Sequence, residues 1–307
     1  MLTIAADQID FEAYRRKAQC RAKIRSAHSF AEDLDAELDA VQGGHPTSFS
    51  MKLRNYVEFR PGEVTAWAGY SGHRKSMFTG QLAMELGLQG ARTLVASFEM
   101  SPGKTLARMC RQFCAAAQPN HFQRSNFMAR TAEKTWLFDH QGRCGTEEML
   151  AVCGFFAEEL AGSQVFIDSM MMVCNSEERL DEQKQFATSL VRLAQETGLH
   201  VHLIAHCRKP ASGDETAPPG KHDLRGSAAI TDQCSNVITV WANKAKAARL
   251  KECPGDHEAA SQPDALLSVC KQRNGSWEGM VRLDFDDPSM RFVDERHPEL
   301  LRDWGAR

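Results

Sequence analysis

The sequence predicts an α/β protein in which helices flank a mainly parallel sheet. Short apolar runs alternate with helical patterns from about residue 51 onward, and this alternation is typical of parallel strands joined by crossover helices. Hydrophobic residues make up 42% of the 307-residue chain, which is enough for a substantial core. A glycine loop between the first apolar run and the first helical pattern supports the same class.

The successive apolar runs are short and bounded by turn residues or helical patterns, so we expect them to be strands. They are residues 62–69, 91–100, 135–140, 163–173, 199–207, 236–244, 264–274 and 279–286. Helices are expected over 75–88, from the end of the second strand to about 117, up to 160 after the third strand, and over about 181–198. The last two strands resemble an antiparallel hairpin at the sheet edge, and polar stretches 210–222 and 244–263 are expected to be mobile loops.

Residues 1–50 are expected to form a separate helical segment, and residues 51–307 the main domain. Apolar residues recur at helical spacing between about residues 7 and 42, among many charges, and residues 43–50 are the natural boundary. Two interpretations of this segment remain open. It is either a helical hairpin packed on its own core or a linker that docks on a neighbouring subunit.

The net charge of −3 excludes a generally basic surface that coats DNA, although it leaves room for local basic loops. The sequence shows no signal-peptide core and no apolar run of membrane-spanning length. We therefore expect a cytoplasmic protein, in the host cytoplasm if it is phage-encoded, with no membrane partner. The ten cysteines are scattered without a C-x-x-C pair, which favours neither zinc nor a disulfide framework.

The stretch GYSGHRKS, residues 69–76, nearly matches the phosphate-binding pattern G-x-x-x-x-G-K-[ST]. In such a loop, backbone N–H groups and a helix N-terminus surround the phosphates, the lysine reaches the β- and γ-phosphates, and the hydroxyl holds Mg²⁺. The nucleotide-binding candidates here are Gly69, Ser71, Gly72, His73, Arg74, Lys75 and Ser76.

Arg74 stands where the pattern has its second glycine. Glycine is usual there because the backbone and a phosphate come very close. An arginine is accommodated if its φ is helical and is strained if its φ is positive. Our hypothesis is that Arg74 lies near the phosphates and adds positive charge there.

Two carboxylates follow apolar strands at the edge where parallel sheets bind ligands. Asp168 ends FIDS and would hold Mg²⁺ through water, opposite Ser76. Glu99 lies in SFEM and would orient and deprotonate an attacking water. Either residue could instead be an ordinary polar side chain at a strand end.

Further polar residues follow the later strands. His206 ends another apolar run and could sense a γ-phosphate and pass its state to Arg208 and Lys209. Lys271 and Arg273 alternate along a strand, so they share one face and could stabilise transition-state charge on a nucleotide. The alternatives are a satisfied strand-end histidine and a solvated strand face.

Taken in order, GYSGHRKS, SFEMS, FIDS, AHCRKP, DLRGSAAI and KQRNG resemble the RecA-like helicase domain of the DnaB/Twinkle family. The resemblance covers roughly residues 50–292 and is greatest to stand-alone phage-type members without a fused primase or zinc-binding domain. It implies a RecA-like P-loop NTPase core. It also implies that the N-terminal helices are the family's linker, which packs on the adjacent protomer of a ring.

The resemblance assigns roles residue by residue, with ATP and Mg²⁺ as the implied ligands. Lys75 and Ser76 match the phosphate-loop lysine and Mg²⁺ hydroxyl, Asp168 the Mg²⁺-associated aspartate, and Glu99 the catalytic glutamate. His206 matches the γ-phosphate sensor, and Lys271 and Arg273 the pair given to the neighbouring subunit's nucleotide. The matching DNA contacts are Arg208, Lys209, Lys221, Arg225, Gly226 and Ser227.

The implied function is an ATP-dependent replicative DNA helicase. It would form a homohexameric ring on single-stranded DNA, with a possible separate primase or loader. A ring would concentrate a few basic loops in one channel, which explains how an acidic chain could bind DNA. Two alternatives stay open: a DNA-stimulated RecA-like ATPase of recombination or repair, and a nucleotide-binding scaffold whose hydrolysis is impaired by Arg74.

Overall fold

The computed structural model describes residues 26–293 apart from 33, 37, 39–43, 48–50, 175–179, 211–212, 214 and 227. The chain divides into two compact units, residues 1–45 and 46–307. The second unit takes in the end of the predicted boundary stretch, because the Phe59 N–H donates to the Pro46 carbonyl and Thr47 pairs with Glu58. Most of the predicted N-terminal helix lies outside the described residues.

The described residues of the first unit include a 3₁₀ turn η2 (Ala27–Phe30), followed by helical residues 31–32, 34–36 and 38. Three apolar side chains recur on it at helical spacing. Phe30, Leu34 and Leu38 expose 40%, 57% and 60% of their surface. Because these side chains are exposed, they do not form a core of their own.

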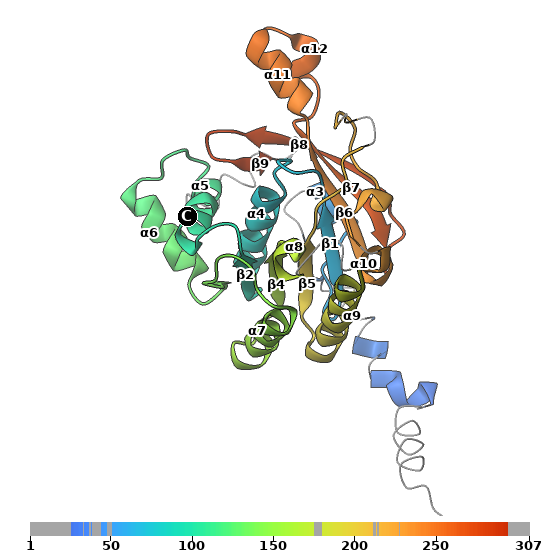
Figure 1. Ribbon diagram of the computed structural model, residues 1–307. Coiled ribbons are helices and arrows are strands. Elements are labelled where there is room, and N and C mark those ends of the chain that lie inside the picture. Colours follow the sequence, from blue (N-terminus) through green and yellow to red (C-terminus); the bar gives the residue numbers. More distant parts are fainter. Residues whose placement is uncertain are drawn as a thin grey trace, which may run out of the picture. The chain divides into compact units, whose positions relative to one another are not determined.

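In the described part of the second unit, nine strands form one sheet in the order β3-β2-β4-β5-β1-β6-β7-β8-β9 (Figure 1). Neighbours from β3 to β6 pair in parallel, and those from β6 to β9 pair antiparallel, which confirms the mainly parallel sheet. The strands are β1 (Val64–Ala68), β2 (Thr93–Ser97), β3 (Thr135–Leu137), β4 (Gln164–Asp168), β5 (His200–Ile204), β6 (Asn236–Ala242), β7 (Ala265–Gln272), β8 (Gly279–Asp286) and β9 (Arg291–Val293).

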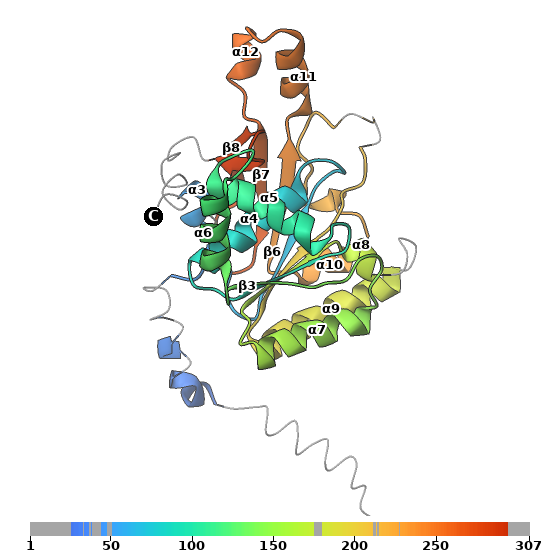
Figure 2. The same ribbon diagram turned by 90° about the vertical axis from the view of Figure 1, so that its left-hand side faces the viewer.

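Helices cover both faces of the sheet (Figure 2). Successive residues of β1 point to opposite sides, so Ala66 and Ala68 join one core cluster and Trp67 joins the other. The first cluster packs under α7 (Thr146–Glu159), α9 (Leu180–Thr197) and α10 (Ala228–Gln233), and the second under α3 (Met51–Arg54) and α4 (Lys75–Leu88). A third cluster joins α4 to α5 (Pro102–Cys114) and α6 (His121–Thr131).

Two buried histidines join neighbouring strands within this core. The His200 Nδ1–H donates to the Arg60 carbonyl (2.7 Å), so its Nε2 accepts from the Thr65 hydroxyl (2.9 Å). The Trp67 indole donates to His202 Nδ1 (3.0 Å), which leaves the proton on Nε2. Burial lowers the pKa of His200 to about 4 and that of His202 well below its usual value, so both rings are neutral.

Four expectations about local structure are corrected. The strand predicted over 163–173 ends at Asp168, and the methionine-rich end forms helix α8 (Met170–Val173), because periodicity cannot separate a short buried strand from a buried helix. Helix α6 was not expected, although Asn120 and Gln123 form a capping box at its start. The polar stretch 244–263 holds α11 (Lys244–Glu252) and α12 (His257–Ala260), and β9 extends the predicted hairpin.

In the part of the chain that the structure describes, no helix combines the length and the apolar character that crossing a membrane requires. The described residues between β5 and α10 are largely irregular apart from a 3₁₀ turn η3 (Lys221–Asp223), and the expected mobility of 210–222 stays a prediction.

Candidate functional site

The phosphate loop, residues 69–76, connects β1 to α4 and borders a cavity of about 270 Å³. We call this space the phosphate cavity. Its walls are residues 71–76 together with Glu99, Arg108, Asp168 and His206. These side chains come from different parts of the chain and meet because β1, β2, β4 and β5 are parallel and end at the same edge.

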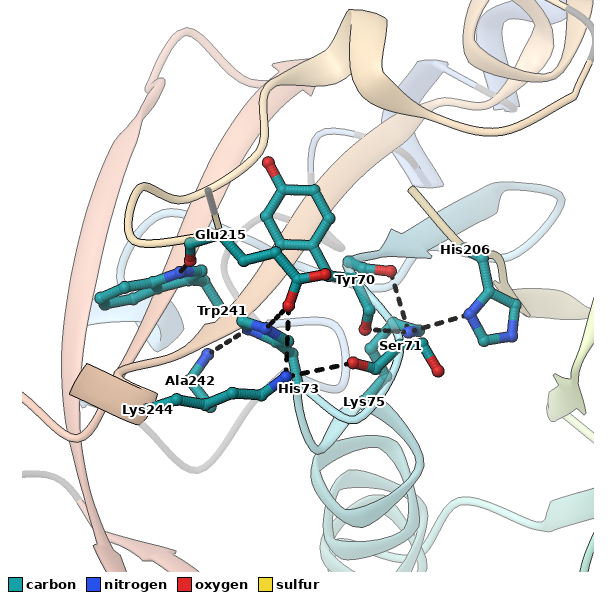
Figure 3. Close-up of polar contacts among 10 residues, drawn as sticks. Tyr70, Ser71, His73, Lys75, His206, Glu215, Trp241, Ala242 and Lys244 are labelled. Atoms are coloured by element: carbon teal, nitrogen blue, oxygen red, sulfur yellow. Dashed lines mark hydrogen bonds and ion pairs between the residues drawn. The ribbon is translucent and has the colours of Figure 1, made fainter. Parts of the chain in front are cut away.

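Lys75 begins α4 and is buried, with 5% of its surface exposed. Its ammonium donates to the carbonyls of Gly69 (2.9 Å) and Tyr70 (2.8 Å) and lies 3.4 Å from His206 Nδ1 (Figure 3). Burial lowers the pKa of this lysine, while nearby Asp168 and Glu99 oppose the effect. The loop thus carries a desolvated cation at the place where phosphates would bind.

His206 lies just after β5 and faces Lys75. Burial, reinforced by the charges of Lys75 and Arg225, lowers the pKa of His206 to about 4. The ring is therefore neutral near pH 7, and its Nδ1 can accept from the Lys75 ammonium. The backbone at this position continues toward the predicted DNA contacts, because the His206 carbonyl accepts from the Arg225 N–H (2.7 Å).

Asp168 ends β4 inside the phosphate cavity. Ser76 lines the same cavity, and a Mg²⁺ site shared by the two residues stays a prediction. Burial raises the pKa of Asp168 and the charge of Glu99 adds to this rise, whereas Ser76, Arg108 and Lys75 oppose it. Two acidic groups in a partly desolvated cavity favour a bound cation.

Arg108 is the residue of the phosphate cavity that the sequence analysis missed. It lies on α5, is 9% exposed, and its Nε has no hydrogen-bond partner within the described residues. A buried donor without a partner is costly, so this group suits an anionic ligand. Arg108 belongs to none of the motifs, because it lies inside a helix, nine positions beyond Glu99, rather than at a strand end.

The residues present fit a magnesium nucleotide. A serine hydroxyl and a carboxylate, Ser76 and Asp168, supply the oxygen ligands that Mg²⁺ prefers. Lys75 and the unsatisfied donor of Arg108 supply positive charge for phosphates. Gly69 is required by packing, because a Cβ there would lie 2.3 Å from a backbone carbonyl of β6.

Arg74 has a left-handed backbone, with φ 64° and ψ 20°, so the strained alternative is the one observed. Its guanidinium lies 3.7 Å from the centre of the Phe285 ring and 3.3 Å from Asp287 Oδ1. Arg74 also lines the cavity, while its guanidinium is stacked on β8 and paired with a carboxylate. The hypothesis that its charge serves the phosphates stays a prediction, and these contacts favour a role at β8.

His73 is completely buried beside Arg74. Its Nδ1 accepts from the Ala242 N–H (3.1 Å), and its Nε2 lies 3.0 Å from a carboxylate oxygen of Glu215. No local sequence pattern indicates this contact, because the two partners lie 142 positions apart.

Half of the predicted DNA contacts line a second cavity of about 400 Å³, called here the basic cavity. They are Arg208, Lys221 and Gly226, and Lys271 lines the same cavity. Glycine is needed at position 226, where φ is 116° and a Cβ would lie 2.4 Å from a glutamine side-chain oxygen. Lys209 and Arg225 are exposed, and Ser227 lies outside the described residues.

Lys271 and Arg273 lie on one side of the β7 end, as the alternation predicted. Lys271 Nζ donates to the carbonyls of Thr231 (2.8 Å) and Asp232 (2.9 Å), and Arg273 donates to the same Asp232 carbonyl (2.8 Å). Burial lowers the pKa of Lys271, and the neighbouring Arg273 charge adds to this. Neither side chain borders the phosphate cavity of the chain as described, so any role on a nucleotide requires another subunit.

Comparison with known families supplies the class of protein that carries this site. A model of the DnaB-like helicase C-terminal domain matches residues 44–294, which is most of the chain. The chain belongs to the DnaB-like helicase family. It is accordingly an ATP-hydrolysing helicase, as predicted.

Two solved structures share the RecA-like fold of this DnaB-like helicase. One is an ATPase domain with a TM-score of 0.72 at 16% identity, covering 88% of this chain and 99% of that one. The other is a DnaB-like replicative helicase described together with its interactions with primase. It matches with a TM-score of 0.70 at 15% identity and covers 93% of this chain and 72% of that one. At these identities the likeness concerns the fold.

Proposed function

We propose that this DnaB-like helicase is a replicative DNA helicase that works as a homohexameric ring and is driven along single-stranded DNA by ATP. The observation that carries the proposal is the position of His206 between the two cavities. Its ring contacts Lys75 in the phosphate cavity, and its backbone carbonyl bonds to Arg225 beside the basic cavity. A change at the nucleotide therefore has a short covalent and hydrogen-bonded route to the DNA contacts.

In this proposal the phosphate cavity binds ATP together with Mg²⁺. Lys75 and the backbone of residues 71–76 hold the phosphates, Ser76 and Asp168 hold the cation, and Glu99 orients the attacking water and accepts its proton. Bound Mg²⁺ neutralises charge on the phosphates. Arg108 adds a positive charge to the same cavity from the chain's own α5.

Two features of this chain support a ring, because each would find its partner on a neighbouring subunit. Lys271 and Arg273 would reach the nucleotide of the adjacent subunit and stabilise charge in its transition state. Residues 1–50 would dock on a neighbour, which accords with the exposed Phe30, Leu34 and Leu38.

An experiment with mixed variants tests whether Arg273 acts on the nucleotide of the adjacent subunit. Lys75→Ala and Arg273→Ala are each expected to be inactive alone, and mixed rings should recover activity at sites that combine an intact lysine with an intact donor.

The DNA contacts would be Arg208, Lys209, Lys221, Arg225, Gly226 and Ser227, lining a central channel. A few cations and backbone N–H groups suit a phosphate backbone and impose no sequence preference. The net charge of −3 is compatible with this, since a ring brings several copies of the same basic loop together. A separate primase or loader is a further expected partner.

Unwinding of a forked duplex tests the proposal directly. The chain should displace the labelled strand in the presence of Mg²⁺ and ATP, and Glu99→Gln should bind ATP and DNA without displacing it. Failure of the wild-type chain to unwind any fork while it hydrolyses ATP would contradict the helicase motor. Filaments on single-stranded DNA in place of closed rings would favour the recombination alternative.

The scaffold alternative draws on one observation, the left-handed backbone of Arg74. Against it, Lys75, Glu99, Asp168 and His206 are assembled around one cavity. A protein that used nucleotide for assembly alone would not need this hydrolytic set.

A further inference from the structure

Glu215 connects the phosphate loop to the segment that carries the predicted DNA contacts Lys221, Arg225 and Gly226. We call residues 215–226 the return segment, because it leads back from the loop after β5 to the basic cavity. Glu215 begins this segment, and one oxygen of its carboxylate lies 3.0 Å from His73 Nε2 and 3.3 Å from Lys244 Nζ (Figure 3). One carboxylate thus bridges two side chains from other parts of the fold.

The direction of the hydrogen bond between His73 and Glu215 is fixed by a third group. The Ala242 N–H donates to His73 Nδ1 at 3.1 Å, so that nitrogen carries a lone pair. Nε2 therefore carries the proton of the neutral ring, and this N–H donates a hydrogen bond to the Glu215 carboxylate. The ring is fully buried within the phosphate loop, between Gly72 and Arg74, so it cannot shift without moving the loop.

Lys244 forms a second connection between the Glu215 carboxylate and the phosphate loop. Its ammonium donates to the Ser71 carbonyl (3.3 Å) as well as to Glu215. Phosphate oxygens bound at residues 71–76 would compete with Glu215 for this ammonium, because the lysine already contacts the loop that would hold them. Nucleotide binding would thereby weaken one of the two bonds that hold Glu215.

The return segment is also bonded to strand β6. The Trp241 indole donates to the Glu215 carbonyl (2.7 Å), and the Thr239 hydroxyl donates to the Pro219 carbonyl (2.9 Å). Farther along, the Arg208 N–H donates to the Asp223 carbonyl (2.7 Å). A displacement at Glu215 is therefore passed along a short, bonded stretch of chain to Lys221 and Arg225.

We propose that Glu215 is a positioning residue that couples the phosphate loop to the return segment, so that a bound nucleotide and bound DNA influence each other through it. The proposal rests on the proposed function for the identity of the second ligand. It is separate from the link through His206, since it leaves the phosphate loop on its opposite side, by His73 and Ser71.

Hydrogen exchange tests the coupling without DNA. In the full-length protein, a non-hydrolysable ATP analogue with Mg²⁺ should change the protection of residues 215–226. Glu215→Ala should abolish that change, and Glu215→Gln should retain part of it, because glutamine still accepts from His73 but no longer pairs with Lys244. Glu252→Ala, at an exposed position of α11, is the matched control and should behave as wild type.

Binding measurements test the same coupling with DNA. Affinity for the ATP analogue should differ about fivefold or more with and without single-stranded DNA in the wild type, and the ratio should approach one in Glu215→Ala. Basal ATP hydrolysis of Glu215→Ala should stay within about twofold of wild type. Because Glu215→Gln keeps the side-chain volume, it covers the case in which the alanine variant does not fold.

Two results would overturn the inference: protection of residues 215–226 that does not respond to nucleotide in the wild type, or an equal response in Glu215→Ala. A wild-type chain whose nucleotide affinity ignores DNA would instead contradict the proposed function. In that case the exchange experiment alone decides the role of Glu215.

Discussion

Arg74→Gly removes the guanidinium and restores the residue that the phosphate-loop pattern has at this position. Arg74 has a φ of 64°, and its guanidinium stacks on Phe285 and pairs with Asp287. The variant therefore relieves the left-handed backbone in the phosphate loop and removes the positive charge that lies against β8.

The effect of Arg74→Gly on stability follows from four opposing contributions. Relief of the left-handed backbone stabilises the variant by about 1–2 kcal/mol. Loss of the Phe285 contact costs about 0.5–1 kcal/mol. The pair with Asp287 contributes about 0.2–1 kcal/mol, because that carboxylate is 81% exposed. The greater freedom of glycine in the unfolded chain costs about 0.4–1 kcal/mol. Together these ranges allow anything from a gain of about 1 kcal/mol to a loss of about 2 kcal/mol in the free energy of unfolding, and their mid-range values give a loss of about 0.5 kcal/mol.

The effect of Arg74→Gly on nucleotide binding should be small as well. The backbone N–H at residue 74 is kept, and the removed charge is already paired with Asp287. We expect the Kd for a non-hydrolysable ATP analogue to change by less than about threefold, measured by titration calorimetry beside a urea unfolding curve. Lys75→Met is the reference for a cation that serves the phosphates. A loss of about tenfold or more in Arg74→Gly, worth about 1.4 kcal/mol, would refute the assigned position of the guanidinium.

Three further predictions concern buried groups. Arg108→Met should slow ATP turnover by about tenfold or more, because it removes an unsatisfied donor from the phosphate cavity. Arg108→Lys should recover part of the turnover. Unchanged turnover in Arg108→Met would exclude a role of this residue in the site. Since burial depresses the folded pKa values of His200 and His202, their contribution to stability is complete above about pH 6.5 and is lost on acidification, for His200 as the pH falls toward 4. For His200 this amounts to about 3 kcal/mol in urea unfolding measured across that range, and a flat profile would contradict their neutral burial. Gly69→Ala should destabilise the fold by about 1–3 kcal/mol and weaken nucleotide binding, because the new Cβ meets a β6 carbonyl, whereas Gly103→Ala has open space and should do neither.

Much of the fold could be predicted because the local patterns agreed with the tertiary structure. Helix α4 spans the predicted residues 75–88, since an apolar helical pattern follows directly on a glycine loop. Helix α11 was missed because its sequence is polar, and its start depends on a cap from Asn243. Helix α6 carried a readable signal, the pair Asn120 and Gln123, which was passed over.

The candidate site likewise contains some residues that could be predicted from the sequence and others that could not. Residues at strand ends, such as Asp168 and His206, could be placed from the sequence, because parallel strands bring their carboxyl ends to one edge. Arg108 could not, since its burial arises from how α5 packs against α4 and α6. Nor could the contact of Glu215 with His73, because no local pattern pairs residues so distant in sequence. The φ of Arg74 was likewise open until the loop was seen between β1 and α4.

Hydrolysis of ATP by the purified chain, with and without single-stranded DNA, is the most direct test of the central claim. The claim is that one nucleotide site, assembled from Lys75, Glu99, Asp168 and His206, drives work on DNA despite Arg74. The account predicts turnover that single-stranded DNA accelerates and that Glu99→Gln removes. Turnover no greater than that of Glu99→Gln, with nucleotide still bound, would contradict it and would favour a site that serves assembly alone.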